Sequence, residues 1–305
     1  MKRIFKPTIF VFFILLLALS CSGKKSNGIL HPFGESLPHD APHPFKPELT
    51  PNGMIIHGGS FSPDLQTYLY TLSDAQYQRF DVWMIERADD TWSQPKKAFF
   101  NSEFNEHGAR LSPDGKTLYF SSTRPTGIEG VAETWHIWKS EKGQNGWSEP
   151  TFVDIPNLRN KGMSHPSITA SGALYFHSNN PDYSEMTLYT AQLKGDDFGE
   201  AKKLAITENS LACTPFVTAD GQTLIYAAIG NRLDLMISIK TADGEWGKPV
   251  ILDKRINTNG QGNPYLTPDG KHLFYTTGTE PEVGESPDWQ VNRVNFSLTI
   301  AKENN

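Results

Sequence analysis

Short apolar stretches and tight turns alternate along most of the chain, and one such arrangement returns five times. The copy at 111–120 reads Leu-Ser-Pro-Asp-Gly-Lys-Thr-Leu-Tyr-Phe, in which a short apolar strand, an Asp-Gly pair and a second apolar strand follow one another. This order predicts a β-hairpin. The third residues of the five turn quartets stand at 63, 113, 170, 219 and 268, so the repeats are 49 to 57 residues apart. The chain is therefore predicted to consist of five homologous units.

Two further elements follow each hairpin at nearly constant spacing. A third strand is predicted in each unit, at 81–84, 136–139, 187–190, 234–237 and 290–293. A fourth begins at an aromatic residue in four units, at Trp92, Trp147, Phe198 and Trp246. No helical periodicity of useful length follows the N-terminal apolar run. Four short antiparallel strands in each unit of about 50 residues predict an all-β fold, a β-propeller with five blades.

The ring of blades is predicted to close through the start of the domain. The fifth unit ends after Asn295 without a Trp-x-x-Pro element, whereas residues 45–49 resemble a shortened one that has no blade of its own. Residues 45–50 are therefore expected to supply the outer strand of the last blade, which would cover both sheet edges. A six-bladed ring is the alternative, although neither 22–50 nor 278–305 contains an Asp-Gly hairpin. The predicted propeller is one domain spanning 45–305.

The repeats resemble the WD40-like β-propeller repeat of the TolB type over residues 50–298. The resemblance rests on three segments, which are Phe-Ser-Pro-Asp at 61–64, Leu-Ser-Pro-Asp-Gly-Lys-Thr-Leu-Tyr-Phe-Ser-Ser-Thr-Arg-Pro at 111–125 and Leu-Thr-Pro-Asp-Gly at 266–270. The third and fourth copies depart from this pattern. The family includes periplasmic scaffolds, substrate-gating domains of peptidases and relatives among polysaccharide lyases. The resemblance therefore implies the fold without selecting one function.

The first 21 residues have the composition of a secretion signal. Three basic residues among the first six precede an apolar run at 9–19, which is too short for an ordinary membrane span. Cys21 resembles the lipidated cysteine of bacterial lipoproteins, and the alternative is a plain signal peptide cut nearby. Residues 22–44 contain many Pro, Gly, Ser and His, and are predicted to form a flexible tether. We expect an exported protein that contacts the membrane only through a lipid anchor and faces the periplasm or the cell surface.

Charge and cysteine content narrow the function classes. The formal net charge is −6, and Lys and Arg are dispersed, which argues against nucleic-acid binding. Apart from Cys21, the chain contains only Cys213, so no intramolecular disulfide can form after processing. In an oxidising compartment, stability must then come from packing. We expect a monomer.

The first strand of each unit is expected to line the central channel, where propellers usually bind ligands. These strands are predicted at 57–62, 107–112, 164–169, 213–218 and 262–267, and none of them contains Asp or Glu. Glycosidic cleavage generally needs two carboxyl groups, so a glycosidase is disfavoured. His57 and His107 occupy equivalent positions, whereas His165 is one position out of register, a spacing that allows the opposite face of its strand. With Arg110 and Asn263, they form the predicted ligand-binding group at one channel mouth.

Two functions remain open from the sequence. The first is a non-catalytic binding module of the bacterial envelope, which recognises a protein or a glycan at the channel mouth or at a rim of loops carrying Arg124 and Asn180. The second is a polysaccharide lyase-like enzyme for acidic oligosaccharides, in which His57 and His107 bind a divalent metal or supply a base. Arg110 or Arg124 would then neutralise the substrate carboxylate. The binding module is favoured, with no catalytic residue, cofactor or metal assigned.

Overall fold

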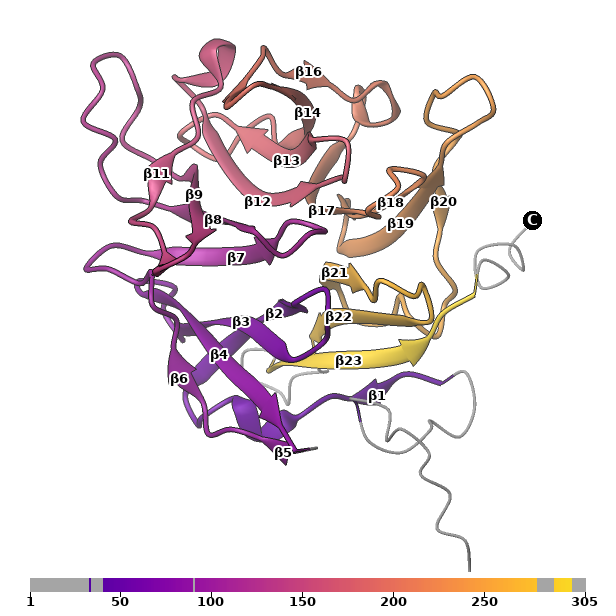
Figure 1. The fold of residues 1–305 in the computed structure, drawn as a ribbon. Coiled ribbons are helices and arrows are strands. Elements are labelled where there is room, and N and C mark those ends of the chain that lie inside the picture. The colour runs from indigo at the N-terminus through magenta and orange to yellow at the C-terminus, as the bar shows by residue number, and fades with distance from the viewer. Residues whose placement is uncertain (1–32, 34–40, 90, 279–287, 298–305) are drawn as a thin grey trace, which may run out of the picture.

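Five small antiparallel sheets stand around a common axis (Figure 1). The computed structural model describes residue 33 and residues 41–89, 91–278 and 288–297. Each sheet contains one hairpin of the repeat and the strand that follows it. The predicted five-bladed propeller is therefore confirmed, and the six-bladed alternative is wrong.

The strands follow the predicted order within every blade. The innermost strands are β2 (Met54–Phe61), β7 (Glu106–Leu111), β12 (Gly162–Ile168), β17 (Leu211–Val217) and β21 (Gln261–Leu266). The second strands are β3 (Thr67–Asp74), β8 (Thr117–Ser122), β13 (Ala173–Asn179), β18 (Thr223–Ile229) and β22 (His272–Gly278). The third strands are β4 (Phe80–Ala88), β9 (His136–Gly143), β14 (Thr187–Lys194), β19 (Leu233–Ile239) and β23 (Trp289–Asn295).

The outer strand of a blade is interrupted at the Trp-x-x-Pro element. Three blades carry it as two pieces, β5 (Thr91–Trp92) and β6 (Lys96–Lys97), β10 (Gly146–Trp147) and β11 (Thr151–Phe152), and β15 (Asp197–Phe198) and β16 (Lys202–Lys203). In the fourth blade, a single bridge between Lys240 and Trp246 precedes β20 (Val250–Ile251). Proline cannot donate to a ladder, so it is tolerated only where strands end or sheets have an edge.

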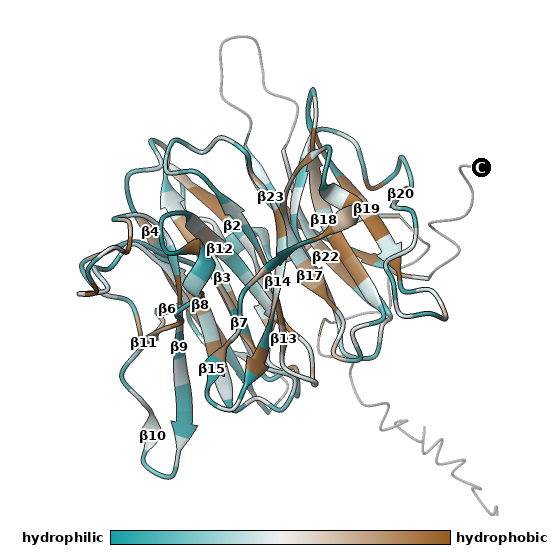
Figure 2. Cartoon of the chain, turned by 90° about the horizontal axis from the view of Figure 1, so that it is seen from above, coloured by the Kyte–Doolittle hydropathy of each residue, from teal (hydrophilic) through white to brown (hydrophobic). Residues whose placement is uncertain are grey.

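The hydrophobic core lies between the blades, because each sheet packs its faces against both neighbours. In β8, Leu118 and Phe120 face the first blade, whereas Tyr119 faces the third. The second strands are buried on both faces and carry Leu-Tyr-Phe at the centre of β8 and β13, with polar residues at one end of each strand. Along the strands, hydrophobic segments accordingly lie beside hydrophilic ones (Figure 2). The stacked cores fix the orientation of the inner strands.

Side chains within each hairpin turn form hydrogen bonds to other groups of the same turn. The hydroxyl of Ser112 donates to Asp114 at 2.6 Å, and the same carboxylate accepts the backbone N–H of Lys116 at 3.1 Å. Gly115 has a φ of +70°, a left-handed conformation that glycine adopts without steric cost. The repeated Ser/Thr-x-Asp-Gly sequence is thus explained by the turn itself.

The closing strand lies slightly before the position predicted for it. β1 (His43–Pro44) pairs with β23, and the N–H of Phe45 donates to the carbonyl of Val291 at 2.8 Å. Residues 45–50 were expected to be this strand, but η1 (Pro47–Leu49) turns them into a 3-10 helix. Pro47 causes this change, because its fixed φ favours the first position of a helix and it has no N–H to donate to β23.

Two other 3-10 turns are present, η2 (Pro156–Leu158) and η3 (Ala205–Thr207). Within the described ranges, no helix has the length and apolar character needed to cross a membrane. The predicted signal, Cys21 and nearly all of the 22–44 tether lie outside the described residues.

We expect Phe45→Ala to destabilise the ring. Phe45 is 7% exposed, and its ring lies 5.3 Å from Tyr68 of the first blade and 5.0 Å from Phe274 of the last. Removing a buried phenylalanine costs about 3–5 kcal/mol, which urea unfolding would measure as a lower midpoint. Ile128→Ala, at a residue that is 42% exposed, is the matched control and should change stability by less than about 0.5 kcal/mol. Equal effects of the two variants would show that Phe45 does not close the ring.

Candidate functional site

Every inner strand contains a bulge at the same place, and this bulge shapes the channel. Pairing between the first two strands shifts register by one residue in all five blades. The extra residue has a positive φ in each case; these residues are Gly58, Gly108, His165, Thr214 and Asn263. A left-handed bulge turns its side chain and its amide out of the ladder. The five bulges therefore form a ring around the axis.

Side chains of the preceding blade accept hydrogen bonds from the bulge amides. The N–H of Gly108 donates to Thr71 Oγ1 at 3.3 Å, and that of His165 donates to Ser121 Oγ at 3.0 Å. The N–H of Thr214 donates to His177 Nδ1 at 3.3 Å. The acceptors Thr71, Ser121 and His177 occupy equivalent positions on the second strands. The same contact thus joins successive blades and places His177 in the channel wall.

A cavity of about 500 Å³ opens where the inner strands begin. Its walls combine histidines with aromatic residues from the loops that lead into the third strands; these residues are His57, His107, His165, His177, Tyr77, Phe80, Trp135 and Tyr183. No Asp, Glu, Lys or Arg is among its lining residues. This volume lies within the range of roughly 300–1,000 Å³ that is usual for small-ligand sites.

Three of the four imidazoles form a row. The ring centre of His107 lies 4.5 Å from that of His165 and 4.2 Å from that of Trp135, and His165 lies 5.1 Å from His177. His57 Nε2 is 2.7 Å from Ser73 Oγ. The bulge explains why His165 shares this cavity with His107 in spite of its different sequence register.

Burial keeps the histidines neutral. It lowers the pKa of His57 to about 4 and that of His177 to about 4, because a charged imidazole would lose its hydration. Burial also lowers the pKa of His107 and His165 well below the usual value, and the neighbouring imidazoles lower both further. Bases with such low pKa values are weak proton acceptors at neutral pH, which counts against an imidazole-catalysed elimination.

Metal binding finds no support among the described residues. No group of three or more His, Cys, Asp or Glu in the described ranges is placed to hold a metal ion. Cys213 lines the cavity as a buried thiol, and burial raises its pKa to about 12. A protonated thiol is neither a strong nucleophile nor a strong metal ligand.

The other predicted site residues have different surroundings. Arg110 lies deeper in the channel, and Asn263 lies beside it around a cavity of about 20 Å³, enough for about one water molecule. Arg124 is not on an open rim, since its guanidinium donates to the fully buried Glu106 at 2.8 Å and its side chain is 13% exposed. Asn180 lies in the loop that carries Tyr183, and its backbone carbonyl accepts a hydrogen bond from the Tyr183 N–H at 2.8 Å.

Sequence reasoning missed the aromatic wall of this cavity. Phe80, Trp135 and Met186 line it, and each stands directly before or at the start of a third strand. The signal was present, since the residue before every predicted third strand is large and apolar; these are Phe80, Trp135, Met186, Leu233 and Trp289. His177 was not predicted, because it lies on the second strand β13, whereas the sequence pattern assigns only first strands to the channel wall.

Comparisons with known proteins identify the fold alone. No protein-family model matches the sequence, and no relative was found among curated proteins. A solved structure described as a TolB from Agrobacterium tumefaciens is similar with a TM-score of 0.51 and 14% identity, over 79% of this chain and 77% of that one. The α-L-arabinofuranosidase of Podospora anserina in complex with cellotriose is similar with a TM-score of 0.51 and 14% identity, over 80% and 91%.

The TolB of Acinetobacter baumannii is also similar, with a TM-score of 0.47 and 16% identity, over 79% of this chain. This chain spans only 54% of that protein. The two structures with a TM-score of 0.51 share the fold but carry different names, so the fold does not assign a reaction.

We predict that the protein loses stability as the pH falls from about 6.5 to about 4. His177 has a folded-state pKa of about 4, so the unfolded chain binds a proton more readily in this window and the folded state is penalised. The full contribution of this one residue to the free energy of unfolding is roughly 3 kcal/mol. His177→Asn, whose side-chain oxygen can still accept the Thr214 N–H, should make the acid loss of stability shallower in urea titrations at several pH values.

Ile128→Ala, at an exposed residue that does not titrate, is the control and should leave the pH dependence unchanged. If His177→Asn and the parent protein lost stability in parallel between pH 6.5 and 4, the burial of a neutral His177 would be refuted.

Proposed function

We propose that this protein is a non-catalytic binding propeller whose cavity at the start of the inner strands takes a neutral glycan. The observation that carries the proposal is the composition of the cavity wall. Tyr77, Phe80, Trp135 and Tyr183 offer aromatic faces, and the polar groups between them are uncharged. Aromatic faces stack on the apolar faces of sugar rings, while neutral donors and acceptors bind hydroxyl groups.

Unused hydrogen-bonding groups support a polar ligand. His165 Nδ1 is buried without a partner among the described residues. A buried polar atom without a partner costs free energy, so a ligand hydroxyl that reached it would be favoured. A charged ligand is disfavoured, because the wall contains no group of opposite charge to compensate for its lost hydration.

Two exposed tyrosines flank the cavity on loops of similar design. Tyr77 and Tyr183 are 50% and 61% exposed and have φ values of +56° and +62°. The N–H of Tyr77 donates to the carbonyl of Asp74 at 3.1 Å, and that of Tyr183 to Asn180 at 2.8 Å. A left-handed backbone is costly for a bulky residue, and such strain is found preferentially at functional sites. We infer that the two rings hold the ligand.

The lyase alternative has little support. It needs a cation beside the histidines to neutralise an acidic sugar, but Arg124 is paired with Glu106, and Arg110 is not among the residues that line the histidine cavity. The low pKa values of the imidazoles also make them poor bases.

We further propose that the protein is exported and anchored in the bacterial envelope through Cys21. The basic start, the short apolar run and the cysteine support this proposal, and the propeller would stand at the end of a tether from the membrane. An envelope location agrees with a glycan ligand, since cell-surface polysaccharides are accessible there.

We expect neutral oligosaccharides to bind and Tyr183→Ala to weaken the binding by about 3–10-fold, the loss that one aromatic contact supplies. Isothermal titration calorimetry with cellotriose, xylotriose and maltotriose would measure the dissociation constants. Cellotriose is included because the Podospora enzyme of the same fold holds it. Tri-galacturonate is the charged counterpart and should bind more weakly than the neutral sugars.

Phe99→Ala is the matched control, because Phe99 is a 51% exposed aromatic residue outside the cavity. It should leave sugar binding unchanged. Tighter binding of tri-galacturonate than of the neutral trisaccharides would contradict the proposal that the ligand is neutral. If the tyrosines bound a peptide and no sugar, the proposed glycan ligand would be wrong and a protein ligand would take its place.

We expect Cys21→Ser to move the protein from the membrane fraction to the soluble fraction of cells that produce the full chain. Lipid attachment requires the thiol, so the variant should also lack the mass of the acyl groups in mass spectrometry. Cys213→Ser is the control and should stay with the membrane. A Cys21→Ser protein that remained in the membrane fraction would show that another segment anchors it.

A further inference from the structure

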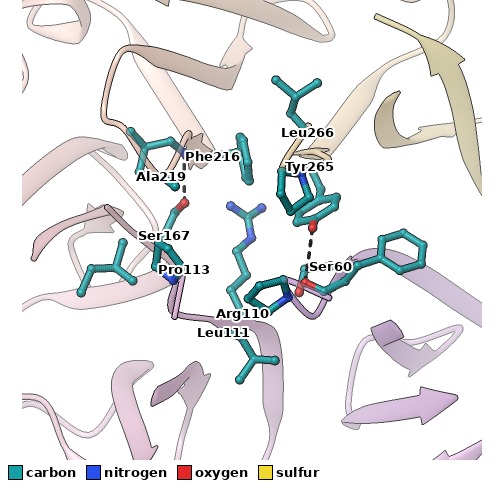
Figure 3. Close-up of a pocket in the computed structure, with 14 residues that line it drawn as sticks. Ser60, Arg110, Leu111, Pro113, Ser167, Phe216, Ala219, Tyr265 and Leu266 are labelled. Carbon is teal, nitrogen blue, oxygen red and sulfur yellow. Dashed lines mark hydrogen bonds between the residues drawn. The ribbon is translucent and has the colours of Figure 1, made fainter. Parts of the chain in front are cut away.

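Arg110 occupies the centre of the channel below the bulge ring. One terminal nitrogen donates to the carbonyl of Pro215 at 2.9 Å, and the other donates to the carbonyl of Pro264 at 2.8 Å. Its guanidinium lies between the side chains of Phe216 and Tyr265, at the base of a second pocket (Figure 3). The described residues thus supply acceptors for two of its five N–H donors.

The charge of Arg110 has no counter-ion in the described part of the chain. None of the described ion pairs includes this residue, although it is only 9% exposed. Burial lowers its pKa to about 10, so it still carries its proton at neutral pH. Buried charges in proteins are normally paired, because the lost hydration is otherwise uncompensated.

The second pocket is an apolar funnel that ends at this cation. It has a volume of about 100 Å³, close to that of about three water molecules, and opens where the inner strands end. Leu111, Ile168, Phe216 and Leu266 supply much of its wall. The hydroxyls in it already serve the protein, since Ser60 donates to the Ala109 carbonyl and Ser167 accepts the Val217 N–H. The N–H donors of the guanidinium beyond the two that bind Pro215 and Pro264 are therefore the polar groups that a ligand in this pocket could meet.

The surroundings of the opening limit the charge of a ligand. Four aspartates of the hairpin turns stand at this end of the propeller; they are Asp64, Asp114, Asp220 and Asp269. Their carboxylates accept bonds within their own turns, and those bonds lower the pKa of Asp64 and Asp114. These carboxylates would repel a multiply charged anion at this opening. A ligand with one negative charge and an apolar body would experience less repulsion.

We propose that this funnel is a second binding site, specific for a small organic monocarboxylate whose carboxylate pairs with Arg110 and whose apolar part packs against Phe216 and the aliphatic wall. The planar guanidinium matches a carboxylate through its fork of donors. The site is separate from the histidine and aromatic cavity, because Arg110 and the bulge ring lie between them.

Thermal unfolding of the full chain with butyrate and with benzoate tests this site. Both carboxylates should raise Tm in a saturable way by about 2–4 °C at high concentration. Butanol and benzyl alcohol, which match them in shape without the charge, should give less than a third of that shift. Potassium chloride and phosphate at equal ionic strength should give none of the saturable component. Equal shifts with the alcohols, or with phosphate, would overturn the proposal.

Two variants locate the response. Arg110→Lys keeps the charge but not the fork, so carboxylate affinity should fall at least tenfold. Ala219→Phe leaves Arg110 untouched and fills the opening from an exposed position, so it should abolish the response even if the Lys variant folds poorly. Tyr183→Ala should keep the carboxylate response whatever its effect on sugars, which separates failure of this site from failure of the glycan site. An unchanged response in Ala219→Phe would refute the location.

Discussion

Three successive blade junctions depend on one repeated contact between the left-handed bulge of an inner strand and the second strand of the preceding blade. A bulge removes an N–H from its own ladder, and a buried N–H without an acceptor costs about 1–3 kcal/mol. Thr71, Ser121 and His177 provide that acceptor at three successive junctions. At the next junction the equivalent residue is Ala227, which has no acceptor, and Thr214 Oγ1 accepts the Asn263 N–H instead at 3.2 Å. The bulge therefore fixes the spacing of the blades and the shape of the channel together.

The number and order of strands could be predicted from sequence because their causes are local. The tight turn, its Ser or Thr residue and the flanking apolar runs lie within about ten residues and recur in each copy, although only three copies keep the Asp-Gly pair, at 114–115, 220–221 and 269–270. The closing strand was less accessible to such reasoning. Its pairing joins His43 to Arg293, and the sequence around Phe45 matched the Trp-x-x-Pro pattern better than the two residues that form the strand. Partners distant in sequence are set by packing, which a local pattern does not contain.

Side-chain direction in the channel was predicted only in part, for a related reason. A strict alternation assigns His107 and His165 to different faces, but a bulge adds one residue and brings their rings within 4.5 Å. The sequence around His165 gives little warning, since histidine rarely adopts a φ of +57°. Gly108 completes the contact, because a Cβ at that position would lie 3.3 Å from the His165 ring. Likewise, the sequence predicts Arg124 on a rim of loops, because its pairing with the buried Glu106 depends on packing that the local sequence does not contain.

Arg110 divides the channel into two chemically different halves. The cavity beside it has a volume of about 20 Å³, room for about one water molecule. On one side, neutral imidazoles and aromatic rings face the cavity; on the other, an uncompensated cation ends an apolar funnel. Since a charge acts strongly only where it is not screened by water, the guanidinium affects ligands in the funnel far more than those in the larger cavity. With the two proposed sites, one buried side chain gives two openings of the same ring different preferences for ligand charge, neutral at one and singly negative at the other.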